Sequence, residues 1–304
     1  MAISVHLTEW LGQPLVDFTG TLEDPKSRAY ALRIGDDDES FEHSLGDLLD
    51  AAGSQDLQSL VVGTWSDEMY DCNSSLVVEA LCANQARLPN LKRLFLGEIT
   101  YEEFEISWIV QSDLSPLLQA FPALEWLTVR GGTSLSFSEL KHENLKGLVV
   151  ESGGLGRGPV AQILAGKLPA LEHLELWLGA SDYGGDTKIE DFEALLGDRL
   201  FPKLRRLGLC NSEYSDDIVA ALAKSAVLDR IQELDLSRGT LGDAGAEPLL
   251  RNARFSILKH LDLRENFLTP GMVSQLAKAL PKANLAEQRD LSEFGGERYC
   301  SVSE

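Results

Sequence analysis

Acidic side chains recur at one fixed place in the second half of the chain. Asp235 in "IQELDL" and Asp262 in "LKHLDL" hold equal places in two similar segments, and Glu233 precedes Asp235 by two residues. If these segments are adjacent strands, the two aspartates are near neighbours. Two facing carboxylates can act as general acid and base, or supply oxygen ligands to a metal ion. Because 48 of the 304 residues are acidic, a solvated acidic strip is the simpler interpretation.

A second stretch could bind a nucleotide. Gly156, Gly158 and Ala161 in "VVESGGLGRGPVAQIL" satisfy the looser dinucleotide fingerprint after a strand-like run. That run is also one copy of a repeat, and the flanking pattern lacks the βαβ sheet that builds a dinucleotide crevice. No P-loop, nucleophile-elbow or zincin motif occurs. We therefore expect a flexible turn here. For the chain as a whole we expect no cofactor and no enzymatic activity.

The charge balance limits the partners. With 48 acidic and 27 basic residues the net charge is −21, which repels nucleic acid and anionic membranes. Basic proteins or peptides are the partners that this charge favours, unless it serves solubility alone.

The four cysteines form no C-x-x-C pair, and no His or Cys cluster has zinc spacing, so we expect reduced thiols in a cytoplasmic protein. The N-terminus lacks signal-peptide features, and no run of about 18 apolar residues predicts a transmembrane helix.

The pattern L-x-x-L-x-L organises most of the chain. Its clear copies start at Leu57, Leu91, Leu124, Leu145, Leu171, Leu204, Ile231 and Leu258, and a weaker copy is "AYALRI". The separations range from 21 to 34 residues, which is typical of leucine-rich repeats with insertions. The Asn that usually follows this motif occurs only as Asn266. We therefore expect no continuous row of asparagines hydrogen-bonded to the backbones of the turns.

Each copy predicts a strand followed by a helix. Alternating apolar residues predict a strand with one buried face, and the following segments have helical spacing. Ser215 and Thr269 are expected N-caps, the latter followed by Pro270. Stacked units bury one continuous core. We therefore predict an α/β fold: a curved solenoid, or horseshoe, with parallel strands on the concave face and helices on the convex face.

The domain boundaries follow from the repeat. We expect an N-terminal cap over residues 1–28, a repeat domain over 29–284, and a polar, frayed tail or cap over 285–304. Long units predict loops that bulge from the solenoid, notably "GEITYEEFEISWIVQSD" and "GASDYGGDTK".

The units "LDLSRGTLGDAGAEPLL" and "LDLRENFLTPGMVSQLAKAL" resemble the ribonuclease-inhibitor-like type of leucine-rich repeat. The chain is also similar to uncharacterised bacterial leucine-rich-repeat proteins that begin with a "GQPLVDF"-like segment. These resemblances imply a scaffold or recognition protein.

The strand register predicts which side chains face the groove. The candidate partner-binding residues are Arg93, Phe95, Trp126, Arg130, His173, Glu175, Trp177, Arg206, Glu233, Asp235, His260, Asp262 and Arg264. We expect Trp126 and Trp177 to be exposed anchors, unless the N-terminal segment or an insert covers them. We expect the carboxylates from Glu175 to Asp262 to attract a cationic segment.

The predicted function is therefore non-catalytic binding of a protein or peptide by a monomer. Two alternatives stay open: a hydrolase-like or metal-dependent enzyme using Glu233, Asp235 and Asp262, and a structural assembly subunit.

Overall fold

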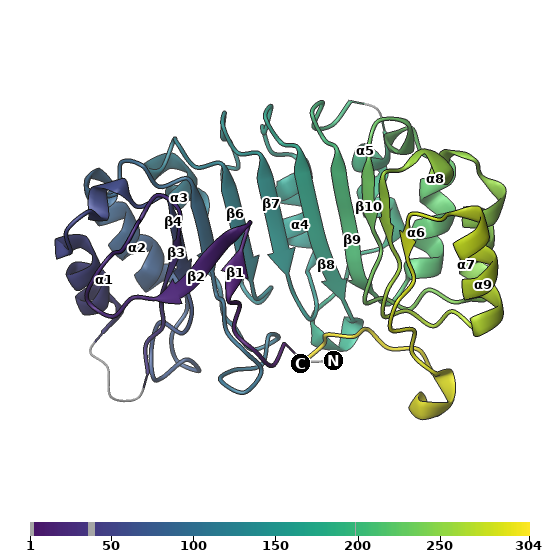
Figure 1. Ribbon diagram of the computed structural model, residues 1–304, viewed down its shortest axis with the longest axis horizontal. Coiled ribbons are helices and arrows are strands. Elements are labelled where there is room, and N and C mark those ends of the chain that lie inside the picture. Colours follow the sequence, from purple (N-terminus) through teal and green to yellow (C-terminus); the bar gives the residue numbers. More distant parts are fainter. Residues whose placement is uncertain (1–2, 36–39, 198) are drawn as a thin grey trace.

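The computed structural model describes residues 3–35, 40–197 and 199–304. Over these residues, one twelve-stranded sheet runs in chain order through a curved body (Figure 1). Strand β1 pairs antiparallel with β2, and every later pairing is parallel. The strands are β1 (Glu9–Trp10), β2 (Gln13–Asp17), β3 (Ala29–Leu32), β4 (Ser59–Val62), β5 (Arg93–Leu96), β6 (Trp126–Arg130), β7 (Gly147–Glu151), β8 (His173–Gly179), β9 (Arg206–Ser212), β10 (Glu233–Asp235), β11 (His260–Asp262) and β12 (Ala283–Asn284).

Helices or short helical turns follow most strands and cover the face opposite the groove (Figure 1). The α-helices are α1 (Phe41–Asp50), α2 (Ser75–Ala83), α3 (Ser115–Ala120), α4 (Arg157–Leu164), α5 (Glu193–Leu196), α6 (Ser215–Leu222), α7 (Asp243–Arg251), α8 (Arg254–Ile257) and α9 (Pro270–Ala279). The 3₁₀ turns are η1 (Ser54–Asp56), η2 (Gln85–Arg87), η3 (Ser181–Tyr183), η4 (Ile189–Phe192), η5 (Val227–Asp229) and η6 (Leu291–Phe294).

The leucines of the repeat form the core. Leu94 pairs in register with Leu60 on one side and Leu127 on the other, and equivalent leucines continue this row to Leu261. All of them are buried. Fully burying such a side chain contributes about 1.5–3 kcal/mol. The predicted leucine-rich-repeat solenoid is thus confirmed, and every clear copy of the motif supplies one strand.

One of the two expected N-caps is present in the structure. Thr269 caps α9 as predicted, because its side chain accepts a hydrogen bond from the Met272 backbone N–H. Ser215 does not cap α6; it is the first residue of that helix, and its hydroxyl donates to the Ser212 carbonyl instead. Asn266 satisfies three buried backbone groups, donating to Leu236 and Leu263 carbonyls and accepting from the Leu241 N–H.

Both ends of the chain are tied to the solenoid. β2 is itself the first parallel rung, inside the stretch expected to be only a cap. The expected fraying at the C-terminus is wrong, because Cys300, Ser301 and Val302 are buried. The Val302 N–H donates to Asn211 Oδ1 at 2.9 Å, and the Arg298 guanidinium pairs with Asp216 at 3.1 Å. The polar composition of residues 285–304 gave no indication of these long-range contacts.

Among the described residues, no helix combines the length and the apolar character that crossing a membrane requires.

Candidate functional site: the concave face

The N-terminal segment covers the first part of the concave face. Trp10 and Leu15 pack on Val61 and Phe95, and the Trp10 and Phe95 ring centroids lie 5.8 Å apart. In Figure 1, β1 lies in front of the sheet at this end. Phe95 is consequently only 1% exposed. The prediction that Phe95 faces an open groove is therefore wrong, because the apolar N-terminal residues need the same surface for their own burial.

Arg130 is also unavailable to a partner. Its Nε donates to Glu151 Oε2 at 2.7 Å and its NH1 to the Ile99 carbonyl at 2.6 Å. The guanidinium also lies 5.2 Å from the centroid of the Phe95 ring. Buried and paired through Nε and NH1, Arg130 holds neighbouring rungs together, and its predicted exposure is wrong.

Trp126 is held across a gap that a glycine leaves in the sheet surface. A Cβ at Gly147 on the next strand would lie 2.1 Å from the Trp126 ring, so only glycine leaves room for it. The ring meets His173 edge-on at a centroid distance of 4.8 Å, and its Nε1 donates to Thr128 Oγ1. Trp126 is half-buried and so less exposed than predicted, and its role as an anchor for a partner stays a prediction.

A hollow of about 550 Å³ opens beside this ring. It is lined by Leu11, Arg93, Glu125, Trp126, Lys146, Glu172, His173, Arg205, Arg206 and Glu233. Five of the predicted site residues therefore meet here: Arg93, Trp126, His173, Arg206 and Glu233. The remaining lining residues come from just before the strands and from the N-terminal turn, positions that the strand register alone did not indicate.

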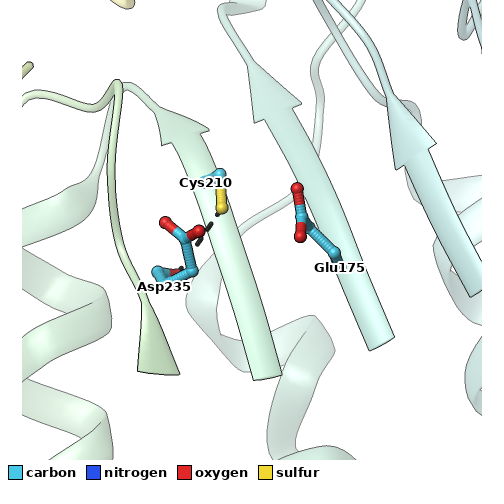
Figure 2. Close-up of side chains that lie close together, drawn as sticks. All are labelled: Glu175, Cys210 and Asp235. Atoms are coloured by element: carbon cyan, nitrogen blue, oxygen red, sulfur yellow. Dashed lines mark hydrogen bonds between the residues drawn. The ribbon is translucent and has the colours of Figure 1, made fainter. Parts of the chain in front are cut away.

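A second glycine gap brings three reactive groups together (Figure 2). A Cβ at Gly208 would lie 2.7 Å from Glu175 Cγ and 3.2 Å from Cys210 Sγ. Glu175, Cys210 and Asp235 converge above this glycine from β8, β9 and β10, with ligand-type atoms within 4.8 Å of one another. The Cys210 thiol donates to the Asp235 carbonyl at 3.6 Å.

The carboxylates of this cluster already have partners. Arg206 lies 3.7 Å from both Glu175 and Asp235. Glu175 is also 3.2 Å from His173 Nε2 and accepts a hydrogen bond from Trp177 Nε1 at 2.9 Å. The Asp235 carboxylate accepts from the Ser237 N–H at 3.0 Å. A metal ion would have to displace these groups.

The two carboxyl groups have opposite pKa shifts. Burial alone would raise the pKa of Glu175, but hydrogen bonds from His173 and Trp177 and the charge of Arg206 outweigh it and lower the pKa to about 2. Burial, then the nearby Glu175 charge, raises the pKa of Asp235. Burial, followed by the charges of Asp235 and Glu175, raises the pKa of the Cys210 thiol, which disfavours the thiolate that metal binding needs.

Trp177 does not anchor a partner in an open groove. It is 4% exposed, and the Arg238 guanidinium lies 4.8 Å above its ring centroid. The prediction of an exposed Trp177 is wrong, because Glu175 on the same strand accepts its hydrogen bond and Arg238, two rungs later, covers its ring.

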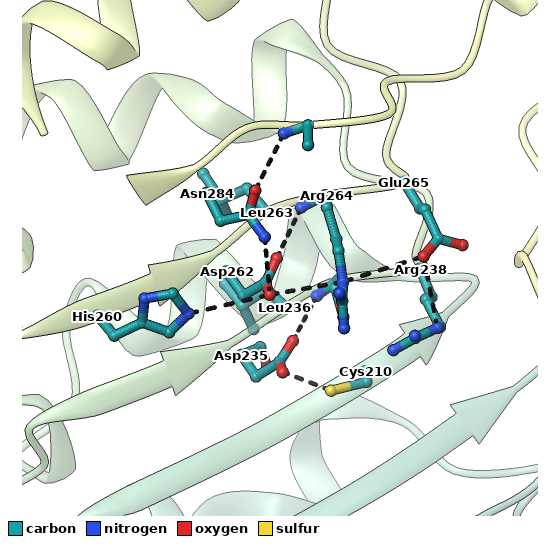
Figure 3. A network of polar contacts seen from close by, with 12 residues as sticks. Cys210, Asp235, Leu236, Arg238, His260, Asp262, Leu263, Arg264, Glu265 and Asn284 are labelled. Atoms are coloured by element: carbon teal, nitrogen blue, oxygen red, sulfur yellow. Dashed lines mark hydrogen bonds and ion pairs between the residues drawn. The ribbon is translucent and has the colours of Figure 1, made fainter. Parts of the chain in front are cut away.

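Asp262 is the centre of a polar network that Figure 3 draws together with Asp235 and Cys210. Its carboxylate accepts from the Arg264 N–H at 3.0 Å and from Asn284 Nδ2 at 3.2 Å, and Arg264 Nε lies 3.5 Å away. His260 Nε2 is 3.9 Å from it. Asp262 pairs in register with Asp235 as predicted, yet both are buried. The expected solvated acidic strip is therefore wrong at Asp235 and Asp262, because neighbouring arginine, histidine and amide groups pair with these carboxylates.

The possible nucleotide turn is occupied by the protein's own carboxylate. At the start of α4, the Arg157 N–H donates to Asp186 Oδ1 at 2.5 Å, and the Arg157 side chain pairs with Asp191 at 3.0 Å. A carboxylate at this helix N-terminus takes the place that a phosphate would need.

Sequence reasoning missed Gly147, Gly208 and Cys210. The signal was present, since both glycines stand in the predicted outward columns beside large side chains. A glycine in such a column indicates a gap that a neighbouring rung can fill.

Comparisons with known proteins support the fold and give no activity. No protein-family model and no curated protein matches the chain. Among solved structures, a protein from Bacteroides fragilis is 30% identical, with a TM-score of 0.81 over 90% of this chain and 77% of its own. An internalin from Listeria monocytogenes aligns over 86% of this chain and 62% of its own, but at 17% identity and a TM-score of 0.40 it bears on neither fold nor function.

Proposed function

Because the chain belongs to the same family as the Bacteroides fragilis protein, and because it is a leucine-rich-repeat solenoid, we propose that it is a non-catalytic scaffold that binds a protein or peptide. The observation that carries this proposal is the hollow beside Trp126. An aromatic ring fixed over Gly147 and framed by charged side chains is the kind of preorganised anchor that dominates binding interfaces. The ribonuclease-inhibitor-like subtype stays an inference from the motif.

The hollow by itself does not select a basic partner. Its charged lining includes Arg93, Arg205 and Arg206 as well as Glu125 and Glu233. The predicted preference for a basic partner therefore rests on the net charge of −21, which attracts cations at long range and speeds encounter at low salt. A cytoplasmic monomer remains the prediction from the sequence.

Capture by immobilised variants tests the concave site. We expect wild-type protein to retain a partner from the native cytosol, and Trp126→Ala to weaken that binding by about 30-fold, as loss of an interface anchor does. Arg251→Ala is the control, since this side chain is 78% exposed on helix α7. Equal capture by Trp126→Ala and wild type would place the binding surface elsewhere.

The enzymatic alternative was predicted for Glu233, Asp235 and Asp262, and one observation favours a different pair that includes Asp235. Glu175 and Asp235 have pKa values shifted in opposite directions, a pattern found in acid–base pairs. The burial of Asp235 and the position of Arg206 argue against it, because a substrate would have to displace Arg206 to reach either carboxylate.

A further inference from the structure

Two loops beside the solenoid carry a cluster of exposed aromatic rings. One loop follows β4 and contains Tyr70; the other follows β5 and contains Phe104 and Trp108. The loops are joined directly, since the Ser74 N–H donates to the Val110 carbonyl at 3.1 Å and the Ser74 and Ser112 hydroxyls lie 2.9 Å apart. The second loop is the insertion that the long repeat unit predicted.

Phe104 meets Tyr70 and Trp108 edge to face, and the Tyr70 and Trp108 rings are tilted toward each other. Tyr70 lies 4.7 Å from Phe104 and 5.4 Å from Trp108, and Phe104 and Trp108 lie 6.1 Å apart, all as centroid distances. Phe104 is buried and forms the base. Tyr70 is 71% exposed and Trp108 46% exposed, so two large rings are held in fixed positions with much of their surface in water. Exposed aromatic surface of this kind marks an interaction site.

The same two loops are strongly acidic. Residues 66–71 and 101–108 contain Asp67, Glu68, Asp71, Glu102, Glu103 and Glu105, and no Lys, Arg or His. Glu103 is engaged by Thr100 and His6, whereas Asp67, Glu68, Asp71 and Glu102 are exposed. These carboxylates share the loops with the rings, so the patch combines aromatic faces with negative charge.

We propose that this surface, the Tyr70 patch (Tyr70, Phe104, Trp108 and the six acidic residues above), binds an extended Arg- or Lys-rich segment of a partner protein. An aromatic face carries negative charge density and attracts a guanidinium or ammonium group. The surrounding carboxylates attract further cations along the segment and repel phosphate-bearing ligands. The patch is a second surface, independent of the hollow beside Trp126.

The Tyr70 patch, and not the concave face, is the surface that we assign to the predicted basic partner. The concave carboxylates Asp235 and Asp262 are buried and Glu175 is half-buried, and each already has a cation beside it, so they cannot supply that recognition. Four acidic residues of the Tyr70 patch are exposed to solvent, as capture of a flexible basic segment requires: Asp67, Glu68, Asp71 and Glu102.

A fluorescent ten-residue peptide of alternating Gly and Arg, titrated with the full-length protein, tests the proposal by anisotropy. We expect saturable binding that weakens with salt, and no binding of the matching Gly-Glu peptide. Tyr70→Ala should weaken binding about fivefold, the usual effect of losing one exposed cation–π contact. Tyr70→Phe keeps the ring face and should retain binding. Tyr299→Ala, at another exposed tyrosine beside a glutamate, should have no effect.

Charge variants separate a local site from general attraction. The triple variant Glu68→Gln, Asp71→Asn, Glu102→Gln should weaken binding about tenfold. The matched variant Glu139→Gln, Glu143→Gln, Asp217→Asn removes the same charge from exposed positions elsewhere and should weaken it less than twofold. Three results would each overturn the proposal. They are equal losses of binding in the two triple variants, unchanged binding by Tyr70→Ala, and no binding of the Gly-Arg peptide at 1 mM protein, which is roughly the weak limit of specific association.

Discussion

Replacing Gly147 with alanine tests how the concave hollow is built. The new Cβ would lie 2.1 Å from Cε3 of Trp126 and 2.4 Å from Cδ2 and Cζ3. Carbon atoms pack at roughly 3.5–4.0 Å, so the rigid indole must move by roughly 1.5 Å or swing out of the hollow. Forcing the overlap costs about 1–3 kcal/mol. Swinging out loses the edge-on contact with His173, worth about 0.5–1.5 kcal/mol, and the hydrogen bond to Thr128, worth about 1 kcal/mol.

Both routes predict a loss of about 1–3 kcal/mol, which urea unfolding can measure. With an m-value of about 3 kcal/mol per M, the midpoint should fall by about 0.3–1 M. Gly46→Ala is the matched control, because it lies inside α1 with nothing within 4 Å of an added Cβ. It should leave the midpoint unchanged or raise it. Partner capture should fall with Gly147→Ala as it does with Trp126→Ala. If Gly147→Ala unfolds like Gly46→Ala and captures like wild type, the indole is not held over this glycine.

Two further predictions concern the cluster above Gly208. Glu175 has a lowered pKa, so its ionised form contributes stability above the ordinary Glu pKa of 4.5, and that contribution is lost as the pH falls toward 2. Glu175→Gln should therefore be less stable than wild type by about 1–3 kcal/mol at pH 7, because removing the Glu175 charge also removes its repulsion of Asp235 and so offsets part of the loss. The urea midpoints of the two proteins should differ less at pH 3. A difference between the midpoints that stays constant with pH would contradict this. Because Arg206 already pairs with both carboxylates and the Cys210 thiol stays protonated, 1 mM Zn²⁺ or Mn²⁺, roughly the limit of specific metal affinity, should not raise the urea midpoint. A rise that Cys210→Ala abolishes would instead establish a metal site.

The sequence by itself determined the solenoid. The L-x-x-L-x-L spacing fixes which side chains enter the core, because a strand alternates its faces and a stacked repeat must bury one of them. It therefore also determined the register that sets Asp235 beside Asp262 and Trp126 beside Gly147. Register follows from local periodicity, and local periodicity is visible in the residues.

Tertiary structure alone decided which outward residues are free. Trp10, about 85 residues earlier in the chain, covers Phe95, and Arg238, two rungs later, covers Trp177. Val302 meets Asn211 across a similar span. The Trp10–Phe95 and Asn211–Val302 contacts join segments with no periodic relation, so no local pattern records them, and the repeat register does not show that the Arg238 side chain lies over Trp177. The Tyr70 patch is another such case, since its rings come from two inserts that meet only in the folded chain.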